Sequence, residues 1–337
     1  MIEENRIFDY FKVRLEELPC NLCGKDNFAV LAKRSGNGLL AQTCMCRNCG
    51  LIYINPRMTK AGYDDYYKYF YRQDRASAKG RNLVQSEKNN WIEQNFLRAR
   101  KFGLALGGLL KDYFKPGLTI DIGSSTGGVL YGLREAIGNL DLLGIEPSIA
   151  ESNFANQKGV KTLNALFENI PEKEIGKAAN ILCVQSLNHL LDPRSFFQRC
   201  FEYLQDGGCL ILSVKNFRHQ ARRAGSIEAG VQIDHPFMFT PETLKLFVES
   251  VGFKVVYLDV DEGKSEFDLR KQRNEGLSRH HIRLAAEKPE KWAGGRMAGV
   301  SKPDVYWKSR LQFWKPYVKL YYWLFYSHRL SFLRKTF

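Results

Sequence analysis

Short apolar runs alternate with amphipathic stretches of helical spacing along residues 118–288. Such runs are typical of strands buried on both faces of a parallel sheet, and the stretches between them are typical of crossover helices. The last of these helices begins after Thr240, with a Pro at its first position and an early Glu. The pattern therefore predicts an α/β fold. The seven expected strands are residues 118–123, 140–146, 160–164, 179–187, 207–216, 253–261 and 280–288.

Two segments precede the predicted sheet. Residues 81–114 are expected to be helical, because apolar residues recur at helical spacing until Pro116 and Gly117 interrupt the pattern. Residues 61–72 are rich in aromatic side chains and are expected to form a helical or irregular connection. We expect these aromatics to pack against the neighbouring domain, and lining of an acceptor pocket is the alternative. The apolar positions of the expected helix are Trp91, Ile92, Phe96, Leu97, Phe102, Leu106, Leu109 and Leu110.

Five of the eight cysteines lie close together near the N-terminus. Two Cys-x-x-Cys-Gly turns, Cys20 with Cys23 and Cys46 with Cys49, have the spacing of a four-thiolate zinc site. Four thiolates close the coordination sphere, so a structural role is expected. Cys44 is the spare cysteine, although a Cys44/Cys46 pair remains an alternative. The other reading of all these cysteines is unliganded surface thiols.

The formal net charge of +14 over 337 residues predicts contact with an anionic partner, such as nucleic acid, a membrane surface or a phosphorylated substrate. The N-terminal stretch MIEENRIFDYFKVRLEELP has early acids and no apolar core, so no secretory signal is expected. We therefore expect the chain to be cytoplasmic. In a reducing cytoplasm, cysteines are more often metal ligands or buried thiols than disulfides.

The stretch TIDIGSSTGG, residues 119–128, resembles a nucleotide-binding loop in which Ser125 replaces the middle glycine. That replacement hinders the close approach of a pyrophosphate. Asp121, at the tip of the first strand, would repel a diphosphate but attract an ammonium or sulfonium cation. Glu146, at the end of the second strand, can accept hydrogen bonds from both ribose hydroxyls of an adenosine. Together these features indicate S-adenosylmethionine as the cofactor.

The chain resembles a class I S-adenosylmethionine-dependent methyltransferase over residues 80–290. The segments that carry the resemblance are DIGSSTGG, LLGIEPS, CVQSLNHLLDP, QDGGCLILSVKN and HPFMFTPETLKLFVESVGFKVV, in that order. The resemblance implies a Rossmann-like seven-stranded sheet with helices on both faces. The cysteine-rich segment followed by CGLIYINPR is also similar to the N-terminal part of a subgroup associated with sugar and surface-polysaccharide modification. This second resemblance implies a sugar or glycan acceptor.

The resemblance also implies which residues bind the cofactor. One departure from the family pattern is Asn188, where relatives often have Glu before the His. The residues implied for the methionine moiety are Asp121, Gly123, Ser125 and Gly127, those for the ribose are Glu146 and Pro147, those for the adenine are Ala165 and Leu166, and those beside the methyl group are Gln185 and Ser186.

Transfer of a methyl group to a hydroxyl requires a base, and histidine suits that role because its ordinary pKa lies near neutral pH. His189 follows the fourth expected strand at the carboxyl edge of the sheet. His235 lies in the loop before the helix that begins after Thr240. Either histidine could be the catalytic base; otherwise His189 orients or packs, and His235 is a structural partner of Asp234. His219 is expected at the surface.

Basic residues concentrate in two places. Residues 216–225 could hold a phosphate or a nucleotide-sugar diphosphate through their arginines, or could be a solvated loop. The tail from Tyr306 mixes aromatics with Lys and Arg and has no acid. Its longest apolar run is too short to span a bilayer. The tail is therefore expected either to lie on the anionic inner face of a membrane or to dock as a helix on the protein.

The predicted organisation is a zinc-binding module at 1–60, a helical connection at 61–114, a methyltransferase domain at 115–290 and a basic aromatic helical tail at 291–337. The predicted activity is methylation of a sugar hydroxyl in a nucleotide sugar or cell-surface glycan. The alternative is an RNA methyltransferase or RNA-binding protein. The positive charge is scattered and no RNA-recognition signature is visible, which argues against nucleic acid as the partner.

Overall fold

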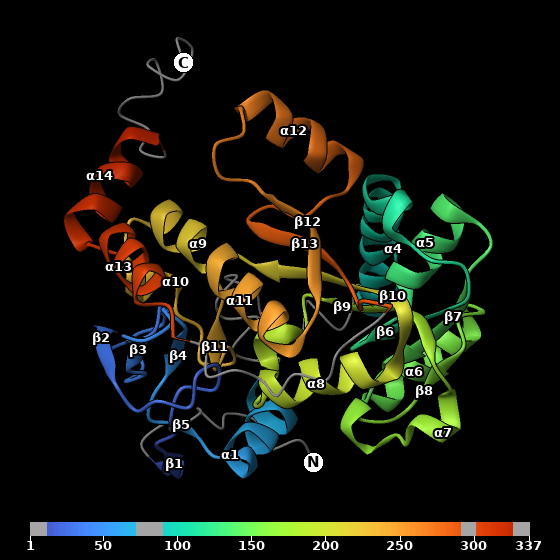
Figure 1. Ribbon diagram of the computed structural model, residues 1–337, viewed down its shortest axis with the longest axis horizontal. Helices are drawn as coiled ribbons and strands as arrows, with labels where there is room; N and C mark the ends of the chain where they lie inside the picture. The colour runs from blue at the N-terminus through green and yellow to red at the C-terminus, as the bar shows by residue number, and fades with distance from the viewer. Residues whose placement is uncertain (1–11, 72–89, 291–300, 326–337) are drawn as a thin grey trace.

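The computed structural model describes residues 12–71, 90–290 and 301–325 (Figure 1). Its main sheet has seven strands in the order β12-β13-β10-β9-β6-β7-β8. All seven expected strands are present, so the predicted seven-stranded α/β sheet is confirmed. Their bounds are β6 Leu118–Ile122, β7 Asp141–Ile145, β8 Thr162–Leu163, β9 Ala178–Val184, β10 Leu204–Lys215, β12 Lys254–Val260 and β13 His281–Glu287.

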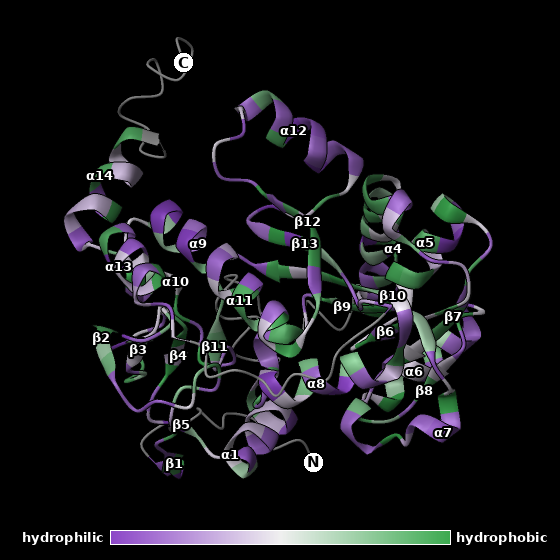
Figure 2. Cartoon of the chain, viewed as in Figure 1, coloured by the Kyte–Doolittle hydropathy of each residue, from purple (hydrophilic) through white to green (hydrophobic). Residues whose placement is uncertain are grey.

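Parallel pairing holds from β10 through β8, but the sheet as a whole is mixed. Strand β13 lies between β10 and β12 and runs antiparallel to both. The connection from β12 carries helix α12 (Glu266–Glu275), which has no buried residue and is largely hydrophilic (Figure 2). This connection does not cross a face of the sheet. The next strand, β13, therefore starts at the same end of the sheet at which β12 finishes and runs in the opposite direction.

Side chains alternate along the central strands between two apolar cores. On β9, Leu182 and Val184 belong to a core shared with α4 and α5, whereas Ile181 and Cys183 belong to a core shared with α8 and α11. Helices therefore cover both faces of the sheet, as expected. The bounds of these and the neighbouring helices are α4 Trp91–Leu110, α5 Gly128–Ile137, α6 Ile149–Gln157, α7 Glu172–Ile175, α8 Pro193–Tyr203 and α11 Pro241–Val251.

The N-terminal segment, residues 15–58, is called the cysteine module. Its sheet has the order β11-β4-β3-β2, and β11 (Phe237–Met238) comes from the part of the chain between β10 and α11. One face of this sheet shares the core of α8 and α11. The module thus packs directly against the helices α8 and α11, which cover one face of the main sheet. Its other strands are β1 Leu15–Glu16, β2 Phe28–Ala32, β3 Thr43–Cys46, β4 Ile52–Ile54 and β5 Arg57–Met58.

The aromatic connection is helical, as α1 (Lys60–Asp65) and the short π-helical segment η2 (Tyr66–Phe70). Tyr63 and Tyr66 are buried in a core beneath the second face of the cysteine module. The expected packing role is therefore confirmed for these two residues. Tyr67 of the same segment points elsewhere, since its hydroxyl lies 2.9 Å from His189 Nδ1 and 3.2 Å from Asp234 O.

The described part of the tail is helical, as expected, with α13 (Pro303–Gln312) and α14 (Lys315–Phe325). Figure 1 shows both helices beside α9 (Phe217–Ala224) and α10 (Ile227–Gly230). Phe313 is buried and stacks on Phe217 with ring centroids 5.5 Å apart. One side of the tail thus docks on the protein. Within the described ranges, none of the helices combines the length and the apolarity needed to cross a membrane.

Candidate active site and cysteine cluster

The predicted cofactor loop connects β6 to α5 at the carboxyl edge of the sheet. Ser125 adopts a left-handed backbone conformation with φ of 49°, and Gly127 follows with φ of 74°. This conformation costs a non-glycine residue about 1–2 kcal/mol. The backbone N–H of Ser125 donates to Glu146 Oε2 at 2.9 Å, which offsets part of that cost. The serine is thus tolerated because the next strand supplies a hydrogen-bond acceptor.

Glu146 follows β7 and is buried. Its Oε1 accepts a hydrogen bond from the backbone N–H of Ser148 at 2.8 Å, while Oε2 holds the loop at Ser125. Burial raises the pKa of the carboxyl group, and the two backbone donors oppose that shift. Each carboxylate oxygen has a second lone pair, so the group can still accept ribose hydroxyls. Glu146 therefore shapes the loop in addition to its predicted role.

Asp121 is buried beneath the loop, and its Oδ1 has no hydrogen-bond partner. Burial, and secondarily the nearby Glu146 carboxylate, raises its pKa well above the ordinary value. Among the described residues, no Lys, Arg or His offsets that rise in the pKa of Asp121. A buried carboxylate with an unsatisfied oxygen suits a ligand that brings a cation. The residues present therefore fit a cofactor with an ammonium group, as predicted for S-adenosylmethionine.

The remaining predicted cofactor residues lie along the same edge. Ser186 lies so close to the loop that a Cβ placed on Gly123 would be 2.5 Å from its Oγ. Gln185 has an unusual positive φ of 60° and donates to Ser278. Pro147 follows Glu146 directly after β7, and Ala165 and Leu166 follow β8, with Leu166 exposed.

The two predicted histidines, far apart in sequence, come together in the structure. Their rings are 4.7 Å apart in an edge-to-face arrangement. His189 ends the 3₁₀ helix η5 (Leu187–His189), and its backbone N–H donates to Ser186 O at 3.0 Å. Its Nδ1 lies 3.0 Å from Asp234 O and 3.7 Å from Asp234 Oδ2. His235 Nε2 lies 3.9 Å from the same Oδ2.

Two further side chains join this cluster. Tyr67, from η2, places its hydroxyl 2.9 Å from His189 Nδ1 and 3.2 Å from Asp234 O. Lys215, the last residue of β10, places Nζ 3.4 Å from His235 Nε2. Neither residue was predicted individually. Lys215 could have been found from the sequence, because it ends a predicted strand at the same edge of the sheet as the candidate cofactor loop. His189, Asp234 and His235 could offer three metal ligands, but the ammonium of Lys215 disfavours a cation there.

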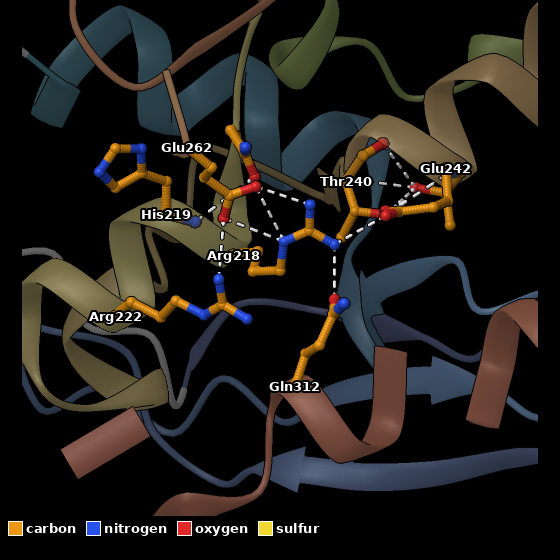
Figure 3. A network of polar contacts seen from close by, with 9 residues as sticks. Arg218, His219, Arg222, Thr240, Glu242, Glu262 and Gln312 are labelled. Atoms are coloured by element: carbon orange, nitrogen blue, oxygen red, sulfur yellow. Dashed lines mark hydrogen bonds and ion pairs between the residues drawn. The ribbon is translucent and has the colours of Figure 1, made fainter. Parts of the chain in front are cut away.

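Two expectations about residues 216–225 are wrong. His219 is buried in α9 rather than at the surface, and burial lowers its pKa. Arg218 and Arg222 are also buried, where Glu262 pairs with both at 2.6 and 3.3 Å (Figure 3). Arg218 further contacts Glu242 and Gln312. These two arginines are neutralised within the protein, so they are not available to hold a phosphate.

The four predicted cysteines converge at one point. Their sulfur atoms lie within 4.8 Å of one another, with Cys20 to Cys49 at 3.5 Å and Cys23 to Cys46 at 3.4 Å. Tetrahedral Zn²⁺ with Zn–S bonds of about 2.3 Å requires sulfurs about 3.8 Å apart, so the cluster fits such an ion. Cys44 is excluded from it and contacts the carbonyl of Asn55. Burial raises the pKa of Cys44 to about 11.

Both Cys-x-x-Cys turns close in the same way. The N–H of Gly24 donates to Cys20 O at 2.7 Å, and the N–H of Gly50 donates to Cys46 O at 2.9 Å. Both glycines have positive φ, 72° and 78°, which explains why glycine follows each pair. The turns aim two sulfurs each at one centre.

Comparison with known proteins identifies the class. Residues 91–258 match the family model described as a methyltransferase domain. This range contains the cofactor loop, every other predicted cofactor residue and both histidines, and it excludes the cysteine module. The protein is an S-adenosylmethionine-dependent methyltransferase.

The chain is also similar to solved structures of methyltransferases. The plantazolicin methyltransferase BpumL in complex with SAH is 15% identical, with 65% of this chain and 99% of that chain covered and a TM-score of 0.45. An S-adenosylmethionine-dependent methyltransferase from Thermotoga maritima is 21% identical, with 60% and 97% covered and a TM-score of 0.41. Neither likeness bears on the acceptor. No curated protein matches the chain.

Proposed function

We propose that the protein methylates a hydroxyl group of a sugar-like acceptor, in a nucleotide sugar or a cell-surface glycan. The observation that supports this most is the histidine pair, which lies with a buried carboxylate next to the cofactor loop. Ser186 contacts the loop at Gly123, and His189 follows one turn later. A base at this position is what a hydroxyl acceptor requires. The sugar class follows from the resemblance of the cysteine-rich segment and CGLIYINPR to sugar-modifying enzymes.

The geometry favours His189 as the base. Its side chain is 27% exposed and that of His235 only 2%, so an acceptor can reach His189 more readily. The Asp234 carbonyl, an acceptor only, lies 3.0 Å from His189 Nδ1, which assigns the ring proton to Nδ1. The basic lone pair is then on Nε2. Asp234 Oδ2, at 3.7 Å, stabilises the imidazolium that forms.

The reaction is a direct displacement at the methyl carbon. The cofactor, when bound, would supply an electrophilic methyl group on a sulfonium, and breaking of its methyl–sulfur bond would leave a neutral thioether. His189 accepts the hydroxyl proton of the acceptor as its oxygen forms the new bond to carbon. Tyr67 and Asp234 hold the imidazole ring in position through Nδ1. His235 packs against the edge of that ring.

A panel of nucleoside diphosphate sugars incubated with methyl-labelled S-adenosylmethionine tests the acceptor class. On an acceptor found in this way, His189→Asn is expected to lower kcat by about 10²–10⁴-fold, because general base catalysis contributes that much. Tyr67→Phe, which keeps the ring and removes only the hydroxyl, is the matched control and should lose less.

Affinity for S-adenosylmethionine should be the same in all three proteins by calorimetry. A His189→Asn variant with the kcat of the wild type would show that His189 is not the catalytic base. Label incorporated into RNA and into none of the sugars would instead favour the nucleic-acid alternative.

For the cysteine cluster we propose a structural Zn²⁺ held by Cys20, Cys23, Cys46 and Cys49. The support is the convergence of the four sulfurs and the exclusion of Cys44. Four thiolates leave no open position for water or substrate.

For the tail we propose attachment to an anionic membrane surface through the side opposite its docked face. Large apolar side chains are exposed there next to Lys308 and Lys319, and Asp304 is the one acid among residues 301–325. Basic residues near an anionic surface contribute about 1 kcal/mol each. The exposed side chains are Trp307 at 61%, Leu311 at 71%, Trp314 at 60%, Leu320 at 51% and Trp323 at 49%.

Replacing Trp307, Trp314 and Trp323 together by Ser is expected to weaken co-sedimentation with phosphatidylglycerol vesicles at low salt by tenfold or more. The loss follows from removal of three aromatic side chains that would insert into the interface. The control is Phe267→Ser, which removes one exposed apolar side chain, 76% exposed, from α12. Deleting the tail is a poor test, because its inner face covers Phe217. Wild-type protein that ignores these vesicles would contradict the proposal.

A further inference from the structure

The cysteine module contacts both chain segments that carry the catalytic histidines. One segment is the loop from His189 to the start of α8, and the other leads from His235 into β11. Two independent sets of hydrogen bonds make these contacts. They connect a module outside the methyltransferase match to the centre of the proposed active site.

The first contact comes from Asn21, which lies inside the first Cys-x-x-Cys turn. Its Nδ2 donates to Asp192 Oδ1 at 2.9 Å, and its Oδ1 accepts from the backbone N–H of Arg194 at 2.9 Å. Asp192 is also the N-cap of α8, where it accepts from the N–H of Ser195. Both the donor and the acceptor of the Asn21 side-chain amide therefore form hydrogen bonds at the start of α8, which begins three residues after His189 at its N-cap Asp192.

A second side chain of the module holds the same loop. Arg57, in β5, is buried and donates from Nη1 to Leu191 O at 2.7 Å. Its Nε donates to Glu16 Oε1 at 3.1 Å, which orients the guanidinium. The chain between His189 and α8 is thus held by two side chains of the module.

The second histidine segment is part of the module's own sheet. Strand β11 begins two residues after His235 and pairs with β4 through Phe237 opposite Tyr53. The N–H of Ile54 also donates to Pro236 O at 2.9 Å. Asn188 joins the two segments to each other, since its Nδ2 donates to Phe237 O at 3.3 Å.

We propose that the cysteine module is a positioning element for the catalytic histidines, with Asn21 as its principal positioning residue for His189. The proposal rests on the function proposed above for the histidine pair. A pair of rings 4.7 Å apart on separate loops needs both loops fixed, because a displacement of about 1 Å can cost about 10²-fold in rate. Metal binding by the two Cys-x-x-Cys turns would hold Asn21, which lies in the first turn, in position to form its hydrogen bonds with Asp192 and Arg194.

The test uses full-length, metal-loaded protein with ¹⁵N-labelled histidine. Asn21→Ala removes both hydrogen bonds and is compared with Lys25→Ala, a replacement of an exposed residue beside the same turn. We expect Asn21→Ala to shift the imidazole ¹⁵N resonances of His189 and to leave those of His281, in β13, unchanged. We also expect its kcat to fall at least tenfold while KM for S-adenosylmethionine and zinc content stay at wild-type values. Lys25→Ala should change none of these.

Unshifted His189 resonances in Asn21→Ala with zinc retained would overturn the positioning role. Shifted resonances with unchanged kcat would equally overturn it. A wild-type protein that transfers no methyl to any acceptor of the panel would defeat the proposed function. In that case the resonances alone would still decide whether Asn21 controls the position of His189.

Discussion

Cys46→Ser is expected to reduce the zinc content of the purified protein from about one ion per chain to near zero. One lost thiolate opens the coordination sphere, and a structural zinc contributes folding free energy directly. Because the cysteine module shares the core of α8 and α11, the loss should also lower the unfolding temperature, by about 5 °C or more for a loss of about 3 kcal/mol. Elemental analysis and calorimetry measure the two effects.

Cys44→Ser is the matched control for this prediction. Cys44 lies two residues away in the same strand, is equally buried, and is not part of the sulfur cluster. It should retain the metal and nearly all of the stability. Equal zinc content in the wild type and Cys46→Ser, or loss of zinc from Cys44→Ser, would refute the four-cysteine assignment.

Asp121→Asn is expected to weaken binding of S-adenosylmethionine by about 10–100-fold, the equivalent of a charge-assisted hydrogen bond of about 1.5–3 kcal/mol. The buried carboxyl group has an unsatisfied oxygen, and burial raises its pKa, so that a cation beside it would favour the ionised form. When folding raises the pKa of a carboxyl group, the protein becomes less stable as the pH rises above the pKa that this group has in the unfolded chain. The cofactor-free Asp121→Asn variant should therefore be more stable than the wild type at neutral pH, and calorimetry measures both changes.

The matched comparison uses ligands that share only part of the cofactor. Methylthioadenosine has the adenosine and lacks both the amino acid and the sulfonium charge, so Asp121→Asn should leave its affinity unchanged. Glu146→Gln should weaken methylthioadenosine and S-adenosylmethionine alike, because it acts on the ribose and on the loop at Ser125. Equal loss of both ligands in Asp121→Asn would show that the carboxylate does not face the ammonium.

Features that depend on residues near one another in sequence were predictable. The seven strands follow from short apolar runs, and the convergence of the four cysteines follows from two turns that each close within five residues. The candidate cofactor loop could be predicted because Asp121 and the glycines lie on one strand and turn, and the end of the next parallel strand must lie beside it. The conformation of Ser125 was not predictable, because its acceptor comes from Glu146.

Features that depend on partners far along the chain were decided by the tertiary structure. The sequence could name His189 and His235 as candidates, but only the folded chain brings their rings together with Asp234 and Tyr67. The burial and pairing of Arg218 and Arg222 could likewise not be predicted, since Glu262 lies 40 or more residues away in sequence from the two arginines that it neutralises.

The sequence by itself determined the class of this protein and the convergence of its four cysteines, because those features are encoded in local spacing and in the order of strands. It also predicted the cofactor loop. The tertiary structure alone decided that β13 inserts antiparallel and that β11 joins the sheet of the cysteine module. It also decided that one side of the tail is docked and the other exposed. Such choices depend on which surfaces remain to be covered once the rest of the chain has folded, and no local pattern carries that information.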